Sequence, residues 1–143
     1  MIQRIQSVWL LVAGLFAFLT YELPFWLTHQ KDGSIHKFLT NTSDSLLIYI
    51  TVILLMILSV GTIFLFKNRP LQLRLCLLGI VVSVGLLILE YKDAVDDKNS
   101  PNFTQGSWQP GIILPILIII ALFLAIRGIR KDQKLVKSLD RLR

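Results

Sequence analysis

The stretch LLIYITVILLMILSVGTIFLF, which runs from Leu46 to Phe66, contains 21 consecutive residues without a charged side chain. A helix needs roughly 20 apolar residues to cross the hydrocarbon core of a bilayer, which is about 30 Å thick. The stretch is followed at once by Lys67 and Arg69, whose charges are costly to place in lipid. It therefore predicts a membrane-spanning helix over residues 46–66.

Three further uncharged runs repeat this pattern and predict spanning helices over about 7–27, 71–89 and 111–127. In the last of them Pro115 removes a backbone donor, so we expect it to bend the helix. The first run follows Arg4, as the apolar part of a signal peptide would. No small-x-small cleavage site comes after Leu19, however, which favours a retained helix.

The composition supports a membrane protein, because only 17% of the 143 residues are charged, against about a quarter in soluble domains. The charges gather in short segments between the apolar runs, which excludes a soluble enzyme with an ordinary core, a disordered chain and a nucleic-acid-binding domain. Four helices and their connections account for nearly the whole chain. We therefore expect one membrane domain over residues 1–143, with two polar loops of about 20 residues each.

The 15 basic residues are divided unevenly between the two sides of this domain. Eleven lie on the side that carries both termini, and four lie on the other side. Because cytoplasmic segments are enriched in Lys and Arg, both termini are predicted to be cytoplasmic. The even number of spans and the short connection at 67–70 indicate an all-α, antiparallel four-helix bundle.

Small residues spaced four apart indicate where membrane helices approach each other closely. Three such pairs occur in the predicted spans: Ala13 with Ala17, Gly79 with Ser83, and Ala121 with Ala125.

The segment 128–143 has the pattern of a short basic amphipathic helix. The interpretation we favour is that this tail lies on anionic lipid of the inner leaflet; docking onto a partner protein is the alternative. RNA is a weaker third candidate, because the tail has no aromatic residue to stack on bases. The residues predicted to make these contacts are Arg130, Lys131, Lys134, Val136, Lys137, Leu139, Arg141, Leu142 and Arg143.

Two acidic residues, Glu22 and Glu90, close separate apolar runs on the side opposite the termini. Two carboxylates at membrane depth could together bind a proton or a cation. The interpretation we favour is that both are hydrated at the headgroup level and end their helices. Asp93 and Asp97 follow Glu90 at helical spacing, but a solvated acidic loop is expected there rather than a metal site.

No other constellation in the sequence indicates catalysis. His29 and His36 are seven residues apart, which is not a zinc-ligand spacing, so an ordinary polar loop is expected. The single cysteine, Cys76, excludes an intramolecular disulfide. Hydrolase, metalloprotease, nucleotide-binding and dithiol motifs are all missing, so no enzyme activity, cofactor or metal is predicted. An enzyme acting on lipid remains only a third alternative.

The two ends of the sequence, MIQRIQSVWLL at 1–11 and IRKD at 129–132 with DRLR at 140–143, resemble an uncharacterised family of small bacterial four-helix inner-membrane proteins. The family carries a "domain of unknown function" label. The resemblance covers nearly the whole chain and implies the same topology in a bacterial inner membrane. It supplies no activity.

The function expected from these features is that of an accessory or scaffold subunit of a larger inner-membrane complex, docking through the basic tail. The alternative is a small proton- or cation-coupled transporter or channel that uses Glu22 and Glu90 at an outer vestibule. The expected partners are membrane lipids, including anionic lipid, and other membrane proteins. A homo-oligomer is compatible with the sequence.

Overall fold

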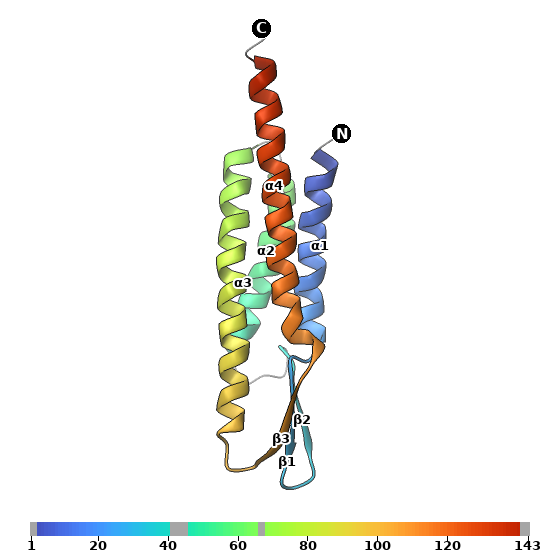
Figure 1. Ribbon diagram of the computed structural model, residues 1–143, viewed down its shortest axis with the longest axis vertical. Coiled ribbons are helices and arrows are strands. Elements are labelled where there is room, and N and C mark those ends of the chain that lie inside the picture. Colours follow the sequence, from blue (N-terminus) through green and yellow to red (C-terminus); the bar gives the residue numbers. More distant parts are fainter. Residues whose placement is uncertain (1–2, 41–45, 66–67, 141–143) are drawn as a thin grey trace.

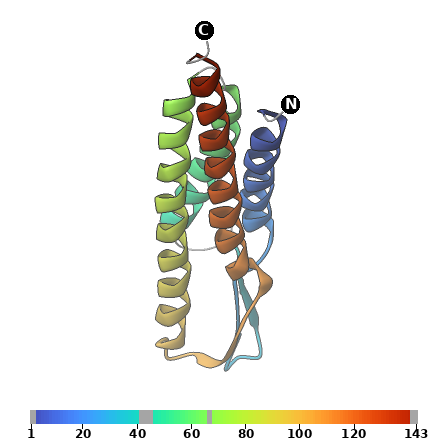
Figure 2. The ribbon, with the colours of Figure 1, turned by 45° about the horizontal axis from the view of Figure 1, so that its top comes forward.

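The computed structural model describes residues 3–40, 46–65 and 68–140. Within them, four α-helices stand side by side, and both chain termini lie at one end of the bundle (Figures 1 and 2). We call this the terminal end, and the opposite end the sheet end. The helices are α1 (Gln3–Glu22), α2 (Leu46–Phe64), α3 (Arg69–Lys98) and α4 (Leu114–Asp140), with the short 3-10 helix η1 (Pro110–Ile113) before α4.

Three of the helical segments are long and apolar enough to cross a membrane: α2, α3 and Pro110–Lys134. In α1 the apolar segment is the shorter Gln6–Glu22. The four predicted helices are therefore confirmed as helices. The predicted end of the first, at residue 27, is wrong, because Pro24 cannot donate to the helical ladder and the chain leaves the helix after Glu22.

The all-α prediction is incomplete, because the two expected polar loops form a small antiparallel sheet. Its strands are β1 (Trp26–Gln30), β2 (Ile35–Phe38) and β3 (Phe103–Trp108), in the order β2-β1-β3. Trp26 pairs with Phe38 on one side and with Trp108 on the other. The turn between β1 and β2 uses Gly33 at φ 76°, a conformation that glycine adopts without strain. The sheet thus joins the α1–α2 connection to the α3–α4 connection.

Helix α3 extends well past its predicted end at residue 89 and stops at Lys98. Its 30 residues correspond to a length of about 45 Å, more than a bilayer core requires. The last turns of α3 accordingly reach the sheet (Figure 1). Glu90 therefore lies inside the helix and does not end it.

Helix α4 is continuous from Leu114 to Asp140, so the predicted basic tail helix is its direct extension. Pro115 lies in the first turn of α4, where a missing amide hydrogen leaves no helical bond unmade. The backbone before it is fixed by Gly111, whose N–H donates to the Pro24 carbonyl oxygen at 3.0 Å. A Cβ at position 111 would overlap that carbonyl, so glycine is required.

The predicted pairs of small residues lie in the core, where the helices pack against each other. Helix α4 packs against α1 and α3, and α2 packs against the same two helices. The six residues of the predicted pairs are all buried: Ala13, Ala17, Gly79, Ser83, Ala121 and Ala125. At Gly79 the approach is so close that an added Cβ would lie 2.9 Å from Leu122 Cδ1.

Candidate functional site

Glu90 is the most unusual side chain of the sheet end. It is completely buried in α3, and neither carboxylate oxygen has a hydrogen-bond partner among the described residues. Buried polar atoms in proteins are nearly always hydrogen-bonded, and ionisable residues in membrane helices are usually functional. The favoured interpretation of Glu90 as a hydrated helix end is therefore wrong, since the bundle encloses the side chain.

Glu22 occupies a different environment from Glu90. It is the last residue of α1, and its side chain is exposed. The acidic pair suggested by the sequence thus consists of one hydrated carboxylate and one buried carboxylate. Only Glu90 has the burial expected of a site within the bundle.

Asp97 connects the end of α3 to the sheet. Its Oδ2 accepts a hydrogen bond from Trp26 Nε1 at 2.7 Å and another from the hydroxyl of Thr28. Both donors are buried, because β1 turns Trp26 and Thr28 towards the bundle with the two-residue period of a strand. The expected solvated loop is instead the last part of a helix, and Asp97 has a structural role there.

Aromatic rings cover the Asp97 contact. The Trp26 and Trp108 rings lie 4.7 Å apart in an edge-to-face arrangement, and Lys98 Nζ lies 4.9 Å and 5.4 Å from their centroids. Tyr91 stacks on Trp108 at 6.3 Å. Gly106 leaves room for the indole of Trp26, which a Cβ at that position would overlap. These contacts fasten the sheet to α3. No local sequence pattern predicted that Trp26 and Asp97 would contact each other.

The two histidines do not converge. His36 pairs with Thr28 and His29 pairs with Ile35, so the two imidazoles lie on opposite faces of the sheet, and both are exposed. Within the described residues no group of three or more His, Cys, Asp or Glu side chains could hold a metal ion.

At the terminal end, the first part of the predicted tail belongs to the bundle. Arg69 of α3 forms an ion pair with Asp132 at 3.0 Å, and Gln6 Nε2 of α1 donates to the Gly128 carbonyl oxygen at 3.1 Å. Ile129, between these contacts, is completely buried. Helix α4 is thus held by two neighbouring helices up to Asp132.

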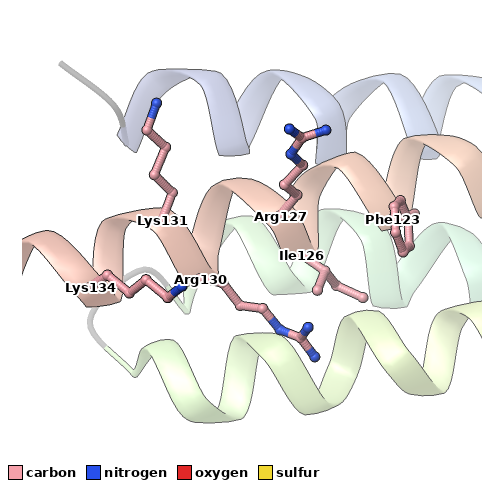
Figure 3. A pocket seen from close by; sticks show the side chains of 6 residues that line it. All are labelled: Phe123, Ile126, Arg127, Arg130, Lys131 and Lys134. Atoms are coloured by element: carbon pink, nitrogen blue, oxygen red, sulfur yellow. The ribbon is translucent and has the colours of Figure 1, made fainter.

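The outward face of the same segment carries a basic hollow of about 370 Å³ (Figure 3). Phe123 and Ile126 form its apolar part, and the side chains of four cations extend around it. All four cations are exposed. The residues that line this basic hollow are Phe123, Ile126, Arg127, Arg130, Lys131 and Lys134.

The remaining predicted contact residues lie further along the chain. The backbone of α4 continues through Val136, Lys137 and Leu139. The other three, Arg141, Leu142 and Arg143, lie outside the described residues.

The family model of a domain of unknown function, DUF4293, matches residues 2–142. The expected membership of a family without an assigned function is thereby confirmed. No curated protein and no solved structure matches the chain.

Proposed function

Since this chain belongs to the DUF4293 family, a domain of unknown function, we propose from its geometry that it is an accessory or scaffold subunit of a larger membrane complex. The observation that carries the proposal is α4. The apolar segment of spanning length, Pro110–Lys134, begins in η1 and continues in α4, and the backbone of α4 extends past it to Asp140 through a basic part of the sequence. In Figure 1 this helix extends past the other three at the terminal end. The proposal requires no catalytic group, cofactor or metal.

We place the helices across a bacterial inner membrane, with the terminal end in the cytoplasm. Eleven of the 15 Lys and Arg residues belong to the segments at that end, and cytoplasmic segments are enriched in these residues. In this placement the sheet faces the outside, and the end of α4 projects into the cytoplasm.

The projecting end of α4 suits docking, because the part of the helix just before it is held by contacts with α1 and α3. The Arg69–Asp132 ion pair and the Gln6–Gly128 hydrogen bond hold α4 just before the projection begins. From Lys134 to Asp140 the helix rises by about 9 Å. A partner that binds there loses little conformational entropy in ordering it. Charge contacts would come from Lys134, Lys137, Arg141 and Arg143, and apolar contacts from Val136, Leu139 and Leu142.

Partner capture tests this proposal. The full chain carries an affinity tag before Met1, which leaves the tail free, and is purified from membranes in mild detergent for mass spectrometry. We expect a stoichiometric membrane partner, which is lost from the double variant Lys137→Gln, Arg141→Gln. The control Lys31→Gln, Lys92→Gln removes the same charge at the sheet end, where both lysines are exposed, and should retain the partner. Recovery of the chain alone, or equal loss from both variants, contradicts the proposal.

A second candidate function, proton- or cation-coupled transport, is favoured by Glu90 alone. A fully buried carboxylate with no hydrogen-bond partner among the described residues has the oxygen atoms that would bind a transported proton or cation. Glu22, being exposed, would act only at the entrance. In liposomes, this function requires a flux that Glu90→Gln abolishes and Glu22→Gln merely reduces. A parent chain without flux, or a Glu90→Gln variant with unchanged flux, rejects it.

A further inference from the structure

We infer that the basic hollow of α4 binds the headgroup of an anionic phospholipid from the leaflet at the terminal end. The inference goes beyond the proposed docking function, because it concerns the hollow on the held segment of α4; of the residues that line it, Lys134 is shared with the projecting end. It depends on the position, the charge and the apolar surroundings of the hollow.

The position of the hollow corresponds to the boundary of the apolar segment. No charged residue occurs between Lys98 and Arg127, so Arg127 is the first charge after a long uncharged stretch. Phe123 and Ile126, which line the apolar part, belong to the last apolar turn before it. Cations at this point of a spanning helix lie at the level of the lipid phosphates.

The four cations are arranged on one side of the helix. Arg127, Arg130, Lys131 and Lys134 follow the spacing i, i+3, i+4, i+7, which places them on a common face. Asp132, the acidic residue within this segment, is paired with Arg69 and mostly buried, so it does not neutralise that face. Arginine guanidinium groups in particular bind phosphate oxygens with two parallel hydrogen bonds.

An apolar stripe continues directly from the cations into the spanning part of α4. Ile116, Ile120 and Phe123 are 46%, 50% and 62% exposed, and they precede Arg127 at steps of four, three and four residues. Side chains at these steps form one row along a helix. A phospholipid with its headgroup in the hollow could therefore lay an acyl chain along this row. Free phosphate would use the cations but not the row, which is why we assign the site to a lipid.

The test measures lipid binding to the purified full chain by native mass spectrometry in mild detergent. The probes are phosphatidylglycerol and phosphatidylcholine with identical acyl chains, each alone and with excess inorganic phosphate. We expect the anionic lipid to bind in preference, with little displacement by phosphate. The variant Arg127→Gln, Arg130→Gln should lose about 25-fold in phosphatidylglycerol affinity, since each cation near an anionic lipid contributes roughly fivefold.

Controls separate a site from general charge attraction. Arg74 is exposed in the second turn of α3 at the same end but does not line the hollow, so Arg74→Gln should bind phosphatidylglycerol like the parent, whereas Arg130→Gln should not. Phe123→Ala should weaken both lipids, because it shortens the apolar row. Circular dichroism verifies that each variant is folded.

Four outcomes overturn the inference: equal binding of the two lipids, equal effects of Arg74→Gln and Arg130→Gln, unchanged lipid affinity in the variant Arg127→Gln, Arg130→Gln, or full displacement by inorganic phosphate. The last would identify a phosphate site without a lipid. Unchanged lipid affinity in that variant would mean that Arg127 and Arg130 do not hold the lipid and are left for another ligand, such as an acidic partner protein. Native mass spectrometry separates the chain alone from any complex with a partner by mass, so lipid binding is measured on the chain alone and failure of the docking proposal would leave these results unaffected.

Discussion

The two ends of the bundle are stabilised in different ways. At the sheet end, strands from two connections pair with each other and are fastened to α3 by the buried Trp26 and by Asp97. At the terminal end, the Arg69–Asp132 ion pair and the Gln6–Gly128 hydrogen bond hold α4 within the described part of the chain, and α4 then continues beyond its neighbours. The comparison teaches that one end is closed by a sheet fastened to α3, while at the other end the contacts between helices stop near Asp132 and α4 continues alone with further charged residues.

The largest change in stability is expected at Trp26, the side chain on which the contact between the sheet and α3 depends. Trp26→Ala removes a completely buried indole together with its hydrogen bond to Asp97, and should lower the free energy of unfolding by about 3–5 kcal/mol. Thermal unfolding in detergent measures this loss. The control Ile35→Ala, at an exposed position of the same sheet, should change stability by less than about 0.5 kcal/mol. Similar losses in the two variants would show that the sheet is not fastened through Trp26.

Removing the buried carboxylate of Glu90, also at the sheet end, should increase stability, whereas Trp26→Ala should decrease it. Glu90→Leu replaces a polar group without a partner among the described residues, and should raise the free energy of unfolding by about 1–3 kcal/mol. Chemical or thermal unfolding provides the measurement, with the exposed Glu22→Leu as the control. A clear loss of stability in Glu90→Leu would mean that Glu90 has a stabilising partner.

At the terminal end the expected effects are smaller. Arg69→Gln breaks the ion pair with Asp132, whose side chains are 24% and 13% exposed, and should cost about 1 kcal/mol because water still screens the pair. A double-mutant cycle with Asp132→Asn isolates the coupling between the two residues. Hydrogen exchange of the 127–134 amides should accelerate in the same variants, and unchanged exchange would show that the pair does not hold α4.

The smallest effect is expected at Gly128, which makes the sharpest contrast with Gly106. An added Cβ at position 128 would lie 3.0 Å from Gln6 Cγ, so the Gln6 side chain would have to shift by a few tenths of an ångström, whereas at position 106 the Cβ would overlap the Trp26 ring. Gly128→Ala should stay within about 0.5 kcal/mol of the parent, since a gain in helix propensity of about 1 kcal/mol offsets the strain at Gln6. Gly106→Ala should destabilise clearly. Equal unfolding temperatures for the two variants would remove the distinction between the ends.

Sequence patterns predicted the helices and their close contacts well, but they failed at the sheet end. The uncharged runs located all four helices, and the spaced small residues, such as Ala13 and Ala17, are buried as expected. The strands were missed because Trp26–Gln30 pairs with Phe103–Trp108, more than 70 residues away. The hydration of Glu90 was predicted wrongly, because burial at that position depends on the elements packed around α3.

The basic hollow was predicted in part. The sequence pointed to Arg130, Lys131 and Lys134 as contact residues, but Arg127, Phe123 and Ile126 were not included. These three residues fall on the other side of the predicted boundary, because the spanning segment is predicted to end at residue 127 and the tail to begin at residue 128. The continuity of α4 places the last apolar turn and the first basic turn on one surface.

The sequence by itself determined that the chain forms long apolar helices and that basic residues gather with the termini, because both properties depend on which residues follow one another. The tertiary structure alone decided which acidic residue is enclosed, where α1 and α3 end, and that two distant connections share a sheet. Those outcomes depend on contacts between segments far apart in the chain, whose free energies appear only once the segments have met.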